Sequence, residues 1–223
     1  MNKLQLVQRF NQEVAATGET ISTTINQTGM IKRLVDWIDS AYQDIQDLHE
    51  DWDFLRADFS FPTVSGTREY AKADISLDEL NAWEVDDIRI YTVTSDETNL
   101  EYTAWDDFKY QFLFGPHRVN TGRPFFFSID PVGSFWTGLI PNAVFTINGE
   151  YFKRAQVMSL DADIPLIPTQ SQMAIVWRAL MFYGAFEGAD EVYSHGEKEF
   201  ARVLSQLEFR EVPRQTFLKG PLA

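Results

Sequence analysis

The feature that most constrains the fold of this sequence is a change of hydrophobic period along the chain. Near both ends, apolar residues recur at three- and four-residue spacing, which is typical of amphipathic helices. In the middle they alternate with polar residues or gather in β-branched runs such as Glu84–Val93, which is typical of strands. This order predicts an α+β protein. The N- and C-terminal helices form a helical bundle, a central antiparallel β-rich insertion interrupts it, and an extended C-terminal tail follows.

The spacing of apolar residues predicts four helices. They cover about residues 3–15, 28–48, 170–187 and 191–209. The third is expected to fray at Gly184 and Gly188, and Pro213 prevents the fourth from continuing. The predicted regions are the N-terminal part of the helical domain (1–53), the β-rich insertion (54–165), the C-terminal part of the helical domain (166–209) and the tail (210–223).

The strongest local signal in the middle region is Asn148-Gly149, which lies between VFTI and EYFK. Asn-Gly favours the positive φ angles that a two-residue hairpin turn requires. The sequence therefore predicts a β-hairpin with its turn at Asn148-Gly149. In that register Phe145 lies opposite Phe152 as an aromatic cross-strand pair.

The third predicted helix is apolar on nearly all of its faces. A helix that is covered on one side only keeps a polar face, so this one needs cover on several sides. Either other helices of the same chain or a neighbouring subunit can supply that cover, and the shortage of further helices favours an oligomer. The predicted subunit-interface residues are Trp177, Leu180, Met181 and Tyr183.

Composition and motifs give no support for a catalytic, cofactor-binding or metal site. The chain of 223 residues has no cysteine, three widely separated histidines, and no P-loop, dinucleotide-binding or nucleophile-elbow motif. Asp161 and Asp163 have a spacing compatible with a hard cation but lack the other ligands of a calcium loop. We therefore expect no enzyme activity and no cofactor. The absence of a signal peptide or long apolar span predicts no membrane association.

The polar face of the second predicted helix is acidic. A net charge of −14 argues against a protein that wraps DNA by neutralising phosphates. The acidic face has two interpretations: a solvated surface, or a wall that repels a polyanion so that nucleic acid passes without sticking. For the second interpretation, the candidate channel-facing residues are Asp36, Asp39, Asp44 and Asp47.

Several sequence elements occur in a distinctive order. They are TGMIKRLVDWIDSAYQDIQDLHEDWDFLR (Thr28–Arg56), GEYF (Gly149–Phe152), and a segment from Ile167 to Glu208 that contains IVWRAL (Ile175–Leu180). This order is similar to that of the head-to-tail adaptor proteins of tailed bacteriophages. The resemblance covers about residues 20–212 and rests on residues of a packing type rather than on a chemical motif.

The resemblance implies a structural connector in the virion neck, between capsid and tail, that assembles in the host bacterial cytoplasm. Such adaptors form a ring, usually of twelve copies, below the portal protein. They extend the DNA channel, let genome DNA pass without specific binding, and give tail or nozzle proteins a docking surface. It also implies that the C-terminal arm docks against the portal, and we favour this interpretation of the aperiodic tail over a plain disordered terminus. The corresponding residues are Val212, Pro213, Arg214, Gln215, Phe217, Leu218 and Lys219.

Two other functions remain open from the sequence. The abundance of aromatic residues and the local pairs of acids are also compatible with a glycan-binding or glycan-cleaving virion protein, since glycosidases use two carboxyl groups. The composition also fits another structural protein of tail completion.

Overall fold

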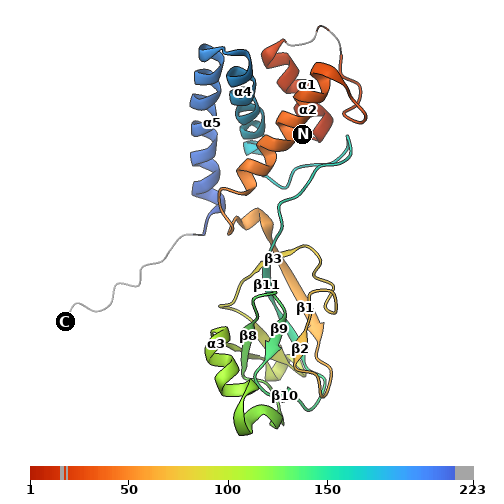
Figure 1. The fold of residues 1–223 in the computed structure, drawn as a ribbon, viewed down its shortest axis with the longest axis vertical. Coiled ribbons are helices and arrows are strands. Elements are labelled where there is room, and N and C mark those ends of the chain that lie inside the picture. The colour runs from red at the N-terminus through yellow and green to blue at the C-terminus, as the bar shows by residue number, and fades with distance from the viewer. Residues whose placement is uncertain (16–17, 19, 214–223) are drawn as a thin grey trace, which may run out of the picture. The chain divides into compact units, whose positions relative to one another are not determined.

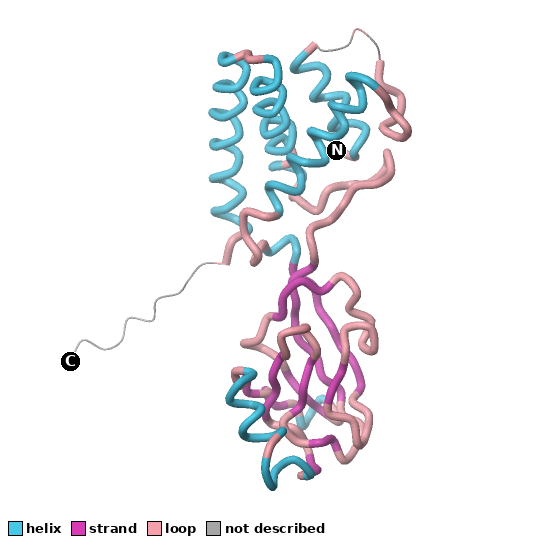
Figure 2. The backbone as a smooth tube through the Cα atoms, viewed as in Figure 1, coloured by secondary structure: helices cyan, strands magenta, loops and turns pink. Residues whose placement is uncertain are grey.

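The computed structural model describes residues 1–15, 18 and 20–213 (Figures 1 and 2). The chain divides into two compact units. A helical unit contains Met1–Leu55 and the chain from Ala155 onward, and a β-rich unit contains Arg56–Arg154. The predicted α+β class is confirmed. Residues 155–165, which the sequence placed with the β-rich insertion, belong to the helical unit.

The helical unit contains the four helices that the apolar spacing predicts. They are α1 (Lys3–Val14), α2 (Gly29–Gln46), α4 (Met173–Glu187) and α5 (Asp190–Glu211), with short 3-10 turns η1 (Asp53–Leu55) and η5 (Thr169–Ser171). Asn2 and Gln5 form a reciprocal capping box that starts α1. Gly188, at φ +67°, ends α4 in the left-handed conformation that glycine adopts without strain.

The core of the helical unit forms where α4 meets α1, α2 and α5. The return segment 155–168 closes this core along α2. Tyr42 on α2 donates from its hydroxyl to Gln156 Oε1 at 2.6 Å and accepts from the Leu166 backbone N–H at 2.9 Å. Gln46 accepts from the Gln156 backbone N–H at 2.7 Å. Burial raises the pKa of Tyr42 to about 12, so its hydroxyl keeps its proton at neutral pH.

The β-rich unit is built from short strands and irregular turns. The strands are β1 (Arg56–Pro62), β2 (Glu69–Tyr70), β3 (Leu80–Trp83), β4 (Arg89–Tyr91), β5 (Thr98–Asn99), β6 (Glu101–Tyr102), β7 (Thr121–Gly122), β8 (Phe126–Ile129), β9 (Phe135–Thr137), β10 (Ile140–Pro141) and β11 (Thr146–Lys153). The helical turns are η2 (Thr94–Asp96), α3 (Trp105–Phe108), η3 (Lys109–Leu113), which is π-helical, and η4 (Gly115–Val119).

The strands form three small sheets. One has the order β1-β11-β4-β5, with β3 also paired to β11, and the others have the orders β2-β9-β8-β6 and β10-β7. Pairing is antiparallel except between β6 and β8 and between β7 and β10, which are parallel. Alternate residues of β1 and β11 point into a core rich in aromatic rings. Its buried aromatic members are Phe59, Phe61, Tyr70, Phe127, Phe135, Phe145 and Tyr151.

The predicted hairpin at Asn148-Gly149 is wrong. Both residues lie inside β11, where Asn148 is opposite Ser60 of β1 and Gly149 is opposite Phe59. Both halves of the segment pair with β1, so Phe152 lies opposite Arg56 and not opposite Phe145. The glycine is explained by packing, because a Cβ at position 149 would lie 3.0 Å from side-chain atoms of Ile88 and Phe59.

In the part of the chain that the structure describes, every helix is too short or too polar to cross a bilayer.

Candidate functional site

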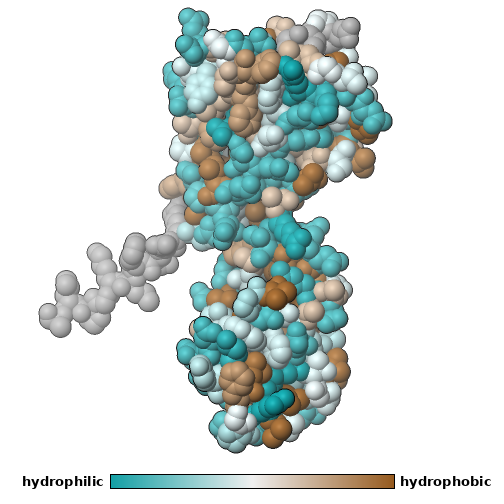
Figure 3. Space-filling view, in the orientation of Figure 1, coloured by the Kyte–Doolittle hydropathy of each residue, from teal (hydrophilic) through white to brown (hydrophobic). Residues whose placement is uncertain are grey.

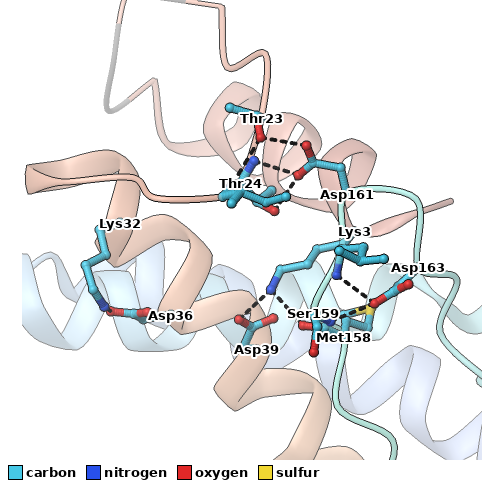
Figure 4. Close-up of polar contacts among 12 residues, drawn as sticks. Lys3, Thr23, Thr24, Lys32, Asp36, Asp39, Met158, Ser159, Asp161 and Asp163 are labelled. Atoms are coloured by element: carbon cyan, nitrogen blue, oxygen red, sulfur yellow. Dashed lines mark hydrogen bonds and ion pairs between the residues drawn. The ribbon is translucent and has the colours of Figure 1, made fainter.

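The predicted acidic face of α2 contains a partly buried ion pair (Figure 4). Asp39 Oδ2 accepts a hydrogen bond from Lys3 Nζ at 2.8 Å, and the same ammonium group donates to the backbone oxygen of Met158 at 2.8 Å. Lys3 is only 5% exposed. Burial raises the pKa of Asp39, and the bond to Lys3 partly offsets this effect. Asp39 therefore joins α2 to α1 and to the return segment, and its charge is compensated.

Two of the other three predicted channel residues are also paired with cations. Asp36 forms an ion pair with Lys32 one turn earlier on α2, and Asp44 accepts from Arg178 of α4 at 2.8 Å and 3.1 Å. Asp47 is exposed at the C-cap of α2. Three of the four predicted channel-facing carboxylates are therefore paired with cations, two of which, Lys3 and Arg178, the fold brings to this face from distant parts of the chain. Their place along a DNA channel stays a prediction.

Asp161 and Asp163 organise the return segment (Figure 4). Asp161 accepts hydrogen bonds from the hydroxyls of Thr23 and Thr24 and from the Thr24 backbone N–H, at 2.5–2.7 Å. Asp163 accepts from the backbone N–H groups of Ser159 and Leu160. Within residues 1–15, 18 and 20–213, no three acidic or histidine side chains gather in a way that would hold a metal ion. The pair therefore acts as a turn-forming and loop-joining element.

These bonds predict an acid-sensitive contribution to stability. Hydrogen bonds lower the pKa of Asp161 and Asp163 below the usual value of 3.8. Because the folded-state pKa is below the unfolded one, the stabilisation is complete above about pH 3.8 and is lost as pH falls through the folded pKa. We expect D161N to make the free energy of unfolding less dependent on pH below that value, measured by urea unfolding at a series of pH values. D47N, which removes an exposed carboxylate of α2, is the control, and an equal change in both variants would contradict the assignment.

The apolar helix α4 obtains most of its cover from its own chain. Leu180 is 2% exposed and Met181 is 6% exposed. The interhelical fit is close, since a Cβ at Gly184 would lie 2.7 Å from the Tyr193 backbone nitrogen, and one at Gly196 would lie 3.1 Å from the Trp177 backbone oxygen. The assignment of Leu180 and Met181 to a subunit interface is therefore wrong, because α1, α2 and α5 together cover what the sequence left open.

The other two predicted interface residues are half-buried and face different neighbours. Trp177 makes an edge-to-face contact with His195 of α5 at 5.5 Å between ring centroids, and its indole Nε1 is buried with no partner among the described residues. Tyr183 packs edge-to-face against Phe10 of α1 and Trp37 of α2, at 6.4 Å and 5.8 Å. The predicted interface residues therefore do not form one continuous surface.

An aromatic edge at the α2–α4 junction was not predicted from the sequence. Phe186 is 52% exposed, packs on Trp37 with a centroid distance of 5.5 Å, and has the Arg33 guanidinium 4.5 Å from its ring centroid. Figure 3 shows hydrophobic colour over α4 among hydrophilic neighbours. We call Arg33, Trp37, Tyr183 and Phe186 the aromatic edge. Tyr183 and Phe186 are three residues apart, which indicates that they share one side of α4. The spacing does not indicate that this side is partly exposed to solvent.

The C-terminal end of α5 borders a shallow hollow of about 720 Å³. Its lining residues are His49, Ser205, Glu208, Phe209, Val212 and Pro213. His49 Nε2 lies 3.2 Å from Glu208 Oε1 and connects the end of α2 to α5. Burial and the neighbouring Asp53 carboxylate raise the pKa of Glu211 in the last turn.

The structure tests only the start of the predicted portal-binding tail. Val212 is half-buried and Pro213 is exposed directly after α5. The remaining predicted tail residues lie outside the described residues. They are Arg214, Gln215, Phe217, Leu218 and Lys219.

In comparisons with known proteins, no family model and no curated protein matches this sequence.

Proposed function

We propose that this protein is a structural head-to-tail adaptor of a tailed bacteriophage. It forms a ring in the virion neck, below the portal protein, extends the DNA channel, and offers tail or nozzle proteins a docking surface. The ring has twelve copies if the resemblance to the adaptor family extends to symmetry. This role requires no active site, because a connector acts by binding neighbouring copies and partner proteins.

The observation that carries the proposal is the layout of the chain. Both chain ends build one helical unit, and a β-rich unit of residues 56–154 is inserted between them. The 22-residue helix α5 follows, and Val212, directly after its last residue, packs against the helical core. A helical domain with a β-rich insertion is the layout that the resemblance implies for adaptors, and the C-terminal arm that it also implies lies outside the described residues.

The subunit contacts of the ring are proposed to involve the aromatic edge. The aromatic edge combines one exposed ring, Phe186, with two half-buried rings and an arginine, and these residue types are enriched at protein interfaces. Closed rings require a heterologous contact, so the aromatic edge of one copy meets a different surface of the next copy. Trp177 and Tyr183 remain candidate interface residues because they are only half-buried. Leu180 and Met181 are buried within their own chain and are no longer candidates.

Removal of the residues after Pro213 is expected to abolish portal binding without unfolding the protein. The full chain mixed with its portal should give a ring, visible by native mass spectrometry and electron microscopy, whereas the chain that ends at Pro213 should stay unassembled. Its circular dichroism and thermal unfolding should match those of the full chain, because the described core ends before this segment.

Two variants of the tail refine this test. F217A/L218A removes the proposed apolar anchors and should weaken portal binding, whereas T216A, at a tail position outside the predicted portal-binding set, should have little effect. Unchanged ring formation by the truncated chain would refute the role of the arm. A monomer that binds glycans but never the portal would instead favour the glycan-binding alternative. Tight, salt-sensitive binding of DNA would contradict passage of DNA without specific binding.

A further inference from the structure

Arg68 is held rigidly at both its backbone and its guanidinium group in the β-rich unit. It lies just before β2, and its backbone oxygen accepts hydrogen bonds from the Thr137 backbone N–H at 3.0 Å and the Thr137 hydroxyl at 3.3 Å. Its guanidinium Nη1 donates to the backbone oxygen of Phe112 in η3 at 2.7 Å. These contacts fix the direction in which the other guanidinium donors point.

The remaining donors of Arg68 have no partner. Its Nε and Nη2 are both buried, and neither has a hydrogen-bond acceptor among the described residues. A buried N–H group without an acceptor is costly, so such a pair needs an explanation. Nε and Nη2 lie along one side of the guanidinium plane, and their N–H groups are parallel. This is the fork that binds two oxygen atoms of one carboxylate or phosphate group.

The charges around Arg68 also lack a counterion. In the same unit, Arg56, Arg89 and Arg123 each form an ion pair with a carboxylate. Neither Arg68 nor Arg118, on the exposed turn η4, forms an ion pair with a described residue. Burial lowers the pKa of Arg68, and the positive charge of Arg118 lowers it further. Arg118 is near Arg68 in the fold because η4, which carries it, follows and contacts η3, to which Arg68 donates its hydrogen bond. Both cations lack a carboxylate partner among the described residues, in a chain with 33 acidic and 19 basic side chains.

We propose that Arg68 and Arg118 form a binding site for a phosphate group. The Nε/Nη2 fork of Arg68 holds two phosphate oxygens, and Arg118 supplies the second positive charge. Phosphate carries between one and two negative charges at neutral pH and so matches two arginines better than a carboxylate does. Because Nε and Nη2 are buried in the structure, the atoms that cover them must move to admit the anion. The proposal is independent of the proposed function.

The test is a titration of the full-length, ¹⁵N-labelled protein with inorganic phosphate, followed by NMR of the arginine Nε–H signals and, in every variant including R68K, of the backbone amide signals of Phe112 and Thr137, which contact residue 68. We expect a saturable shift of the Arg68 signal. R68K keeps the charge but lacks the fork, and it should lose about tenfold or more in affinity. R118Q changes an exposed residue, is expected to fold normally, and should bind phosphate several-fold more weakly. The matched control R202Q removes an exposed arginine of the helical unit and should leave the affinity unchanged.

Acetate is the second probe, and it should bind more weakly than phosphate because it has a single charge. Three results would overturn the proposal. They are the absence of a saturable shift, which would mean that water alone satisfies the fork; equal phosphate affinity of R118Q and the unmodified protein; and acetate binding as tight as phosphate binding.

Discussion

W52A is expected to lower the free energy of unfolding of the helical unit by about 3–5 kcal/mol. Trp52 is fully buried, and its ring stacks on Phe54 at 5.2 Å and meets His49 edge-on at 4.8 Å. Its indole N–H donates to the backbone oxygen of Ile45 at 3.1 Å, in the last turn of α2. Truncation therefore opens a cavity and removes one of the hydrogen bonds to a helix-terminal carbonyl.

The measurement is urea unfolding followed by circular dichroism at a wavelength that reports helices. L48A is the control, because Leu48 is a nearby apolar residue that is 49% exposed, and its truncation should cost less than about 1 kcal/mol. W52F separates the two contributions, since it keeps an aromatic ring but loses the hydrogen bond and should cost less than W52A. A loss in W52A no larger than that in L48A would show that Trp52 does not close the core between α2 and η1.

G184A is expected to destabilise the protein by about 2 kcal/mol, although helix propensity alone predicts the opposite sign. Alanine in a helix interior is favoured over glycine by about 1 kcal/mol. At position 184, however, the new Cβ would lie 2.7 Å from the backbone nitrogen and 2.9 Å from the Cα of Tyr193. Backbone atoms cannot move aside as a flexible side chain can, so α5 would have to shift away from α4.

The matched control is A185G on the exposed side of the same helix. It should lower the free energy of unfolding by about 1 kcal/mol through propensity alone. Thermal and urea unfolding of both variants measure the two effects. If G184A were more stable than the unmodified protein, the close approach of α4 and α5 at Gly184 would be wrong.

Gly184 shows why part of the sequence interpretation failed. A glycine near the end of a helical pattern is compatible with fraying. The sequence does not show that the backbone of α5, at Tyr193, packs directly against this position. The cation partners of the acidic face of α2 were hidden for a similar reason. Lys32 lies one turn from Asp36 and was predictable as its partner, but Lys3 is 36 residues away from Asp39. The unpaired fork of Arg68 has no signature in the sequence at all.

Local patterns by themselves determined the helices, the strand-rich middle and therefore the α+β class, because helix and strand periods reflect which side chains share a face of one element. Only the tertiary structure decided whether Asn148-Gly149 turns or continues, what covers α4, and which cations meet the acids of α2. Each of these depends on segments that are distant in sequence and adjacent in space. Strand pairing with β1 prevails over the turn preference of Asn-Gly, since it satisfies a longer row of backbone hydrogen bonds and buries Gly149 against Phe59 and Ile88.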